Sequence, residues 1–331
     1  MNTSVISLPG AQQQDFLDSL AQEFKYNFAQ LSEGAERELA GRPFIFSRYG
    51  KELYPYFEEA DAALVPGCII PIKEGRPVAS VDSTCITLGE TAKGALYAAR
   101  TAVGMSYEGS LRRFFRLGPI LVYASESGLV GLGERVCGPE LSLALSDHSV
   151  AERVVRNSLE RRVLEALLAG RGESIAMADG SLKHPMGQRT GRLGAGLEEG
   201  KCLVGFSKSS SLIFSAGALG TLTKAEAPSF CRVAEGPVPT VLAKFAKDGL
   251  VFRLDVASKR DDVATVLGRI AWNDAFSSGY PDSLKLAHHL SVFSGAEVQG
   301  LKALVAKRFR LKQVPTFQLR SVALGSFKGG S

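Results

Sequence analysis

Two stretches decide the fold, Val78-Ala79-Ser80-Val81-Asp82 and Ile175-Ala176-Met177-Ala178-Asp179. Each is a short apolar run closed by an acid, a pattern that predicts a buried strand with an aspartate at its carboxyl end. Open α/β sheets place their sites at this end of the strands. Asp82 and Asp179 are therefore expected in equivalent positions, although an aspartate before Gly or Ser also commonly caps a turn.

The composition is that of a packed globular protein with 331 residues, of which 45% are apolar and 22% are charged. The net charge of +5 permits a polyanionic partner without requiring one. Five scattered cysteines with no CxxC pair argue against a disulfide framework and a structural zinc site. The first thirty residues lack a basic start followed by an apolar run, so we expect a cytoplasmic protein with no membrane segment.

An amphipathic helix is predicted from about Val150 to Leu168. At 100° per residue, Glu160 falls within the apolar arc of this helix, whereas Glu165 falls on the opposite side. A carboxylate on the apolar side must be paired or bound to a metal, because burying an uncompensated charge is costly. The alternative partner is a core arginine such as Arg253, which shares one face of a predicted strand with Asp255.

Asp82, Glu160 and Asp179 together supply hard oxygen ligands of the kind that Mg²⁺ and Mn²⁺ prefer. Two such ions about 4 Å apart activate water and stabilise the leaving oxygen of a phosphodiester. The sequence has no Walker A loop, no GxSxG elbow, no HExxH and no complete dinucleotide-binding loop. Tyr280 precedes His288 by eight residues, roughly two helical turns, so both side chains could point the same way; His289 is the rival of His288.

Basic residues concentrate in three regions. The segment from Gly187 to Gly200 is a glycine-rich loop that carries Arg189 and Arg192. Two further groups are either solvated helix faces or a surface that follows phosphates: Arg112, Arg113 and Arg116 beside Phe114 and Phe115, and Lys302, Lys307, Arg308, Arg310 and Lys312. Lys208 and Arg253 are further candidates for contacts that offset charge on a phosphate.

The order of these motifs resembles the NurA nuclease family over roughly residues 75 to 295. The resemblance is carried by Val81-Asp82-Ser83, the helix with Glu160, Ala178-Asp179-Gly180-Ser181-Leu182, Val204-Gly205-Phe206-Ser207-Lys208, Gly279-Tyr280-Pro281 with Leu284, and Ala287-His288. It implies an RNase H-like core and Mn²⁺-dependent cleavage of single- and double-stranded DNA. It also implies a dimeric ring that works with the hexameric HerA translocase in DNA end resection.

Matched residue by residue, the resemblance places the catalytic and metal-binding positions on Asp82, Glu160, Asp179, Tyr280 and His288. Lys208 is matched as an additional phosphate contact. The bound cofactor is expected to be Mn²⁺, with Mg²⁺ as the alternative, and two ions are expected. Cleavage from an end and within a strand are both compatible with these residues.

We therefore predict an α/β protein with an RNase H-like mixed sheet, its strand-end acids at one edge of the sheet, and helical additions at both ends. The expected divisions are an N-terminal helical region over 1–65, a nuclease core over 66–295 that includes the loop 187–200, and a C-terminal basic helix and final strand over 296–331. The alternative is a non-catalytic DNA-binding or assembly subunit on the same fold, with structural acids.

Overall fold

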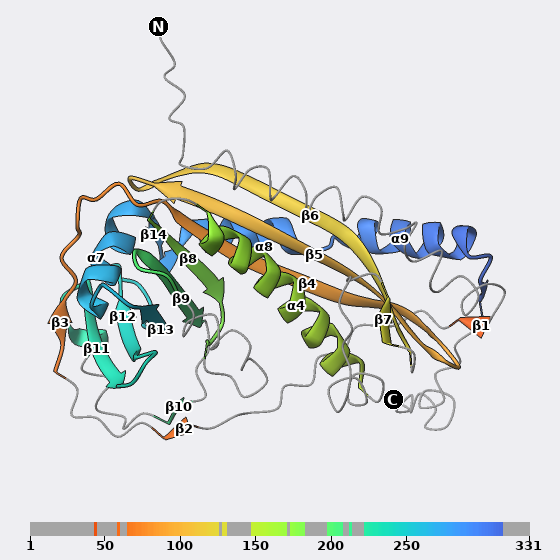
Figure 1. The fold of residues 1–331 in the computed structure, drawn as a ribbon, viewed down its shortest axis with the longest axis horizontal. Helices are drawn as coiled ribbons and strands as arrows, with labels where there is room; N and C mark the ends of the chain where they lie inside the picture. The colour runs from red at the N-terminus through yellow and green to blue at the C-terminus, as the bar shows by residue number, and fades with distance from the viewer. Residues whose placement is uncertain are drawn as a thin grey trace, which may run out of the picture.

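A computed structural model gives the fold (Figure 1). It describes residues 65–125, 128–130, 147–170, 173–182, 197–207 and 222–313, together with three two-residue strands at 43–44, 58–59 and 212–213. Most of the predicted N-terminal helical region, most of the loop 187–200 and the predicted final strand near Phe317 lie outside the described residues. The predicted division into three regions stays a prediction.

A ten-stranded mixed sheet forms the body of the protein, in the order β3-β11-β12-β13-β9-β8-β4-β5-β6-β7. Its strands are β3 (Gly67–Cys68), β4 (Val78–Thr91), β5 (Gly94–Tyr107), β6 (Ser110–Ser125), β7 (Gly128–Val130), β8 (Ser174–Asp179), β9 (Lys201–Ser207), β11 (Ser229–Ala234), β12 (Thr240–Lys244) and β13 (Phe252–Ser258).

Five central strands have the RNase H-like arrangement. Strands β4, β5 and β6 form an antiparallel meander, and the chain then crosses through α4 (His148–Ala169) to β8, which is parallel to β4. Strand β9 follows parallel to β8. The resulting order β6-β5-β4-β8-β9 confirms the predicted fold class, and the antiparallel strands β13, β12 and β11 extend the sheet beyond β9.

Helices cover both faces of the sheet (Figure 1). Helix α4 lies on one face, where Leu159 and Val163 pack against Val81 and Ala99. The other face carries α7 (Val263–Asn273), α8 (Asp282–Ser291) and α9 (Gly295–Arg308). Burial on both faces explains why the Ala-rich part of β5 shows no clear strand alternation: its residues from Ala95 to Ser106 are all buried, so small apolar residues point both ways.

The remaining elements are short. They are β1 (Pro43–Phe44), β2 (Glu58–Glu59), β10 (Leu212–Ile213), β14 (Phe276–Ser277), β15 (Tyr280–Pro281) and β16 (Lys312–Gln313). Within the described part of the chain, no helix is both long enough and apolar enough to cross a bilayer.

Two expectations about local structure need correction. Asp82 lies inside the 14-residue strand β4 and not at its end. It still lies just beyond the last residue of β4 that pairs with β8, as Asp179 does on β8, and β4 and β8 are both inner strands of the ten-stranded sheet. The strand β6, and not a helix face, carries Arg112, Arg113 and Arg116. They precede the residues of β6 that pair with β7.

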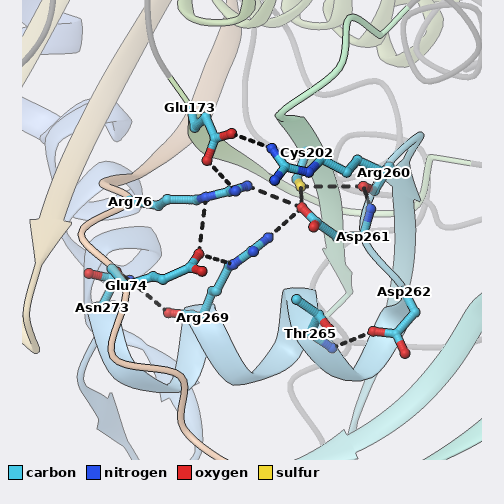
Figure 2. A network of polar contacts seen from close by, with 11 residues as sticks. Glu74, Arg76, Glu173, Cys202, Arg260, Asp261, Asp262, Thr265, Arg269 and Asn273 are labelled. Carbon is cyan, nitrogen blue, oxygen red and sulfur yellow. Dashed lines mark hydrogen bonds and ion pairs between the residues drawn. The ribbon is translucent and has the colours of Figure 1, made fainter.

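A network of ion pairs joins the segment before β4 to α7 (Figure 2). Arg76 pairs with Glu74 at 3.4 Å and with Asp261 at 3.1 Å, and it also contacts Glu173, the residue before β8. Arg269 of α7 pairs with Glu74 at 2.7 Å and also contacts Asp261. Each buried guanidinium therefore has carboxylate partners, as buried charges require.

Candidate metal centre

The candidate centre lies where β4 and β8 separate. The two strands are paired from Val78–Ile175 to Val81–Ala178, and the pairing stops there, although β4 continues to Thr91. Asp82 and Asp179 are the next residues along each strand, so their side chains project from the same face at the point of separation. The predicted equivalence of the two aspartates follows from this parallel register.

Asp82 is a buried carboxylate that accepts three hydrogen bonds. Its Oδ1 accepts from the backbone N of Ser83 at 2.8 Å, and its Oδ2 accepts from Ser291 Oγ at 3.2 Å. His288 Nδ1 lies 2.7 Å from the same Oδ2. Ser291 and His288 both belong to α8, so Asp82 fixes the C-terminal part of that helix against β4.

Asp179 is held by an aromatic hydroxyl. Tyr280 Oη donates to Asp179 Oδ1 at 3.2 Å, and the Tyr280 ring packs edge-on against Phe206 at 5.2 Å between centroids. Burial and the charge of Asp179 raise the pKa of Tyr280, so its hydroxyl keeps its proton. Because the ring is buried, the hydroxyl and not the ring faces the acids, which leaves no open ring surface on which a base could stack.

Asp82, Asp179 and His288 form a donor set that fits a divalent cation. One ligand atom from each lies within 4.8 Å of the others. Two carboxylate oxygens and an imidazole nitrogen suit Mn²⁺, and Mg²⁺ accepts the carboxylates as readily. The side chain of His288 is 45% exposed, so the site is open to solvent on the side of α8.

Glu160 approaches the same acids from α4, on the other face of the sheet. Burial raises its pKa to about 8, Arg156 opposes this shift, and the nearby charges of Asp82 and Asp179 add to it. Glu165 instead pairs with Arg161 at 2.9 Å, and its side chain is exposed. The helical phase therefore distinguishes the two acids as expected, although Glu160 is not among the three closely grouped donors.

The two histidines of α8 differ in the same way. His288 contacts Asp82, whereas His289 is exposed and is not part of the donor set. Tyr280 does approach the acids together with His288, but it does so from β15 and not from the helix. The idea that the eight-residue interval sets both side chains on one helix is therefore wrong.

The predicted phosphate contacts are less well supported. Arg253 is 6% exposed, and its Nη2 lies 3.2 Å from Asp255 Oδ1, so it is committed to a buried ion pair and is not open to a phosphate. Among the described residues, the positive charge that lowers the pKa of Glu160 is that of Arg156 and not that of Arg253. Lys208, Arg189 and Arg192 lie outside the described residues, and their roles stay predictions.

Sequence reasoning missed the residues that support the centre. Asp274, the C-cap of α7, accepts from the backbone N and the hydroxyl of Ser283, and the latter also contacts Ser80 Oγ of β4. These contacts fix the start of α8, the helix that carries His288. The sequence offers only a weak signal here, an acid directly after an apolar helix, because Ser80 and Ser283 are 203 residues apart.

Comparison with family models and with curated proteins gave no match. Solved structures do resemble the chain. The NurA nuclease from Sulfolobus solfataricus has 13% identity and a TM-score of 0.46, over 92% of this chain and 97% of that chain. A second NurA structure has 10% identity and a TM-score of 0.44, over 95% and 99%. Endonuclease V from Bacillus subtilis has 12% identity and a TM-score of 0.36, over 86% and 94%.

Proposed function

We propose that this protein is a metal-dependent nuclease that hydrolyses phosphodiester bonds in single- and double-stranded DNA. The observation that carries the proposal is the grouping of Asp82, Asp179 and His288, whose ligand atoms lie within 4.8 Å of one another. The RNase H-like order of the strands places this grouping at the carboxyl ends of the parallel pairing, where open sheets commonly hold their sites.

Asp82, Asp179 and His288 would hold the cation, with Glu160 as a further carboxylate from α4. A bound Mn²⁺ or Mg²⁺ lowers the pKa of water and stabilises negative charge on a phosphate, and two ions are expected in this proposal. The neighbouring charges that raise the pKa of Glu160 are those a cation would neutralise, so the acids and the cation are complementary.

The chain's own residues would orient and transfer protons. With its proton on Nδ1, His288 donates to Asp82 Oδ2, and its other ring nitrogen is then a base that can hold the cation or move a proton. Tyr280 keeps its hydroxyl proton and directs it to Asp179, which fixes the rotamer of that carboxylate. In hydrolysis, a water oxygen bonds to phosphorus, and the departing oxygen gains a proton.

The test is cleavage of end-labelled single- and double-stranded DNA by the purified protein with Mn²⁺, with Mg²⁺ and with EDTA. The proposal expects cleavage with Mn²⁺ and none with EDTA. DNA binding with no hydrolysis under any of these conditions would favour the alternative, a non-catalytic DNA-binding or assembly subunit. The same end-labelled products distinguish exonuclease from endonuclease action.

We extend the proposal to a cytoplasmic homodimer that acts with a HerA-type hexameric translocase in DNA end resection. This extension rests on the resemblance of the ordered motifs to the NurA family. Light scattering across micromolar concentrations tests the dimer, and stimulation of cleavage by a HerA-type ATPase with ATP tests the partnership. A monomer at all concentrations would contradict the proposed homodimer.

A further inference from the structure

We propose that Asp255 is a positioning residue that holds Asp179 in place for cation binding, an inference that rests on the proposed function. Asp255 lies on β13 and is 0% exposed. Its Oδ2 accepts from Ser181 Oγ at 2.6 Å and from the backbone N of Leu182 at 3.0 Å. Ser181 and Leu182 directly follow Asp179 and Gly180, so one carboxylate fixes the turn that leaves the candidate centre.

The other oxygen of Asp255 is anchored away from this turn. Its Oδ1 accepts from Thr240 Oγ1 of β12 at 2.7 Å, and Arg253 donates to it from Nη2 at 3.2 Å and from Nε at 3.3 Å. Arg253 compensates the buried charge, and the carboxylate is therefore held from both sides. Asp255 is thus tied to the sheet by one oxygen and to the turn by the other.

The backbone around the turn is built for this close approach. Gly180 has a φ of +126°, a conformation that disfavours other residues, and its N donates to the Phe206 carbonyl at 2.9 Å. The turn then passes directly over Gly205, where an added Cβ would lie 2.6 Å from the Gly180 carbonyl oxygen. A side chain at Gly205 would push the turn away from Asp255.

Asp255 cannot itself bind the cation. Asp255 on β13 pairs with Gly205 on β9. Leu182, whose backbone N donates to Asp255, packs in the hydrophobic cluster beneath α4, so Asp255 lies on the α4 face of the sheet. Asp179 points to the opposite face of the sheet, where it meets Tyr280. The influence of Asp255 on Asp179 therefore passes through the backbone from Gly180 to Leu182. Residues that orient metal ligands commonly change metal affinity by about 10- to 100-fold when they are removed.

The experiment compares Ser181→Ala with Thr240→Val. Ser181→Ala removes one hydrogen bond between Asp255 and the turn, whereas Thr240→Val removes one between the same carboxylate and β12 and leaves the turn contacts intact. Mn²⁺ binding is measured by calorimetry on the full chain without DNA, and the melting temperature is recorded for each variant. Asp255→Asn is the direct change, but it leaves the buried Arg253 without its carboxylate and so disturbs folding as well as the turn. The variants that remove a single hydrogen bond therefore decide.

We expect Ser181→Ala to weaken Mn²⁺ binding about tenfold, and Gly205→Ala to do so at least as strongly, while Thr240→Val, which leaves Arg253 and both turn contacts on Asp255, weakens it clearly less than Ser181→Ala does. Unchanged Mn²⁺ affinity in Ser181→Ala and Gly205→Ala would overturn the positioning role and leave the proposed function standing. If the wild-type protein binds Mn²⁺ but cleaves no DNA, and the two variants bind Mn²⁺ more weakly as expected, the positioning role is sustained and the proposed function is overturned. Wild-type protein that binds no Mn²⁺ would overturn both.

Discussion

The charged residues at the two ends of the paired part of β4 and β8 are arranged in opposite ways. At the amino ends, Arg76 precedes β4 and Glu173 precedes β8, and the two side chains form an ion pair within a network that includes Asp261 (Figure 2). At the carboxyl end of their pairing, Asp82 and Asp179 lie side by side, and their carboxylates contact His288 and Tyr280 respectively. Opposite charges are matched at one end, and like charges are gathered at the other.

We interpret this difference as one between structural charges and the charges of the proposed metal site. A buried ion pair with all its partners supports a fold, and removal of one partner is costly because the other is left buried. A cluster of acids without a matching cation lowers the stability of the folded chain, and such a conflict is typical of functional sites. The comparison therefore predicts that changes at the carboxyl end will lower activity without lowering stability, whereas changes at the amino end will lower stability without lowering activity.

The largest effect is expected from changing the two aspartates of the candidate centre. Asp179→Asn should lower the rate of DNA cleavage more than a hundredfold, or about 2.7 kcal/mol in the barrier, because it removes a ligand and no packing volume. Asp82→Asn should do the same. Melting temperatures should stay the same or rise, since like charges are removed. The measurement is the initial cleavage rate in Mn²⁺ with parallel thermal melts.

Glu173→Gln is the matched control at the amino end of β8. It weakens the contacts of Glu173 with Arg76 and Arg260 and should lower the stability while leaving the cleavage rate within about twofold. Activity of Asp179→Asn within tenfold of wild type would contradict the metal role. A Glu173→Gln enzyme that is folded and inactive would contradict the division of roles between the two ends.

Substitutions of Glu160 and Glu165, both on α4, should differ strongly in their effect. Glu160→Gln should eliminate Mn²⁺-dependent cleavage, because Glu160 lies in the field of Asp82 and Asp179. The metal-free variant should melt no lower than wild type, because a carboxylate in like-charge surroundings has been removed. Glu165→Gln loses only an exposed pair with Arg161 and should leave activity and melting almost unchanged. An inactive Glu165→Gln with an active Glu160→Gln would reverse the assignment.

The sequence predicted Asp82, Asp179 and Glu160 as candidate site residues because their signals are local. Asp82 and Asp179 each follow an apolar run, and Glu160 is distinguished from Glu165 by helical phase alone. The placement of Asp82 at a strand end was wrong, because β4 continues to Thr91 and is buried on both faces around Asp82.

The supporting contacts were not predictable, because they join segments far apart in the chain. Ser181 and Asp255 are 74 residues apart, and Asp82 and His288 are 206 apart. Arg253 was expected to offset charge on a phosphate. Asp255 lies on the same strand and was visible as a neighbour, but the burial of Arg253 depends on the flanking strands β9 and β12, which a single strand does not reveal.

A moderate effect on stability is expected from Asp274, the buried acid that fixes the start of α8. Burial raises its pKa from 3.8 to about 6, against the hydrogen bonds of Ser283. The folded state therefore binds a proton more tightly than the unfolded state, and this group's contribution is full below pH 4 and is lost as the pH rises to about 6. The loss is at most about 3 kcal/mol.

Asp274→Asn tests this prediction, because the amide resembles the protonated acid and still accepts from the backbone N of Ser283. Chemical denaturation from pH 4 to 7 should show a weaker decline of the free energy of unfolding in the variant than in wild type. At pH 7 the variant should be at least as stable as wild type. Identical pH profiles for the two proteins would contradict the shifted pKa.

The smallest effect should come from the exposed arginines of β6, and it concerns binding alone. Arg113 and Arg116 flank Phe114, which is 60% exposed, and no carboxylate of the described residues lies within ion-pair distance of either arginine. A cation without an acidic partner is available to a phosphate, and each phosphate neutralised contributes about one unit to the salt dependence of binding. Arg116→Gln should thus weaken DNA binding severalfold and reduce the log–log salt slope by about one.

Arg260→Gln is the control from the opposite, charge-matched end. Arg260 is also exposed, at 58%, but it is already paired with Glu173 at 2.7 Å, so its loss should leave the salt slope unchanged. Binding is measured by fluorescence anisotropy with labelled single- and double-stranded DNA, in EDTA to prevent cleavage. The salt concentration is varied from about 50 to about 200 mM, a range over which such slopes are resolved. Equal slopes for wild type and Arg116→Gln would show that the β6 arginines only solvate the strand, and DNA would then have to be held by other basic residues, among which Lys208, Arg189 and Arg192 are the sequence-based candidates.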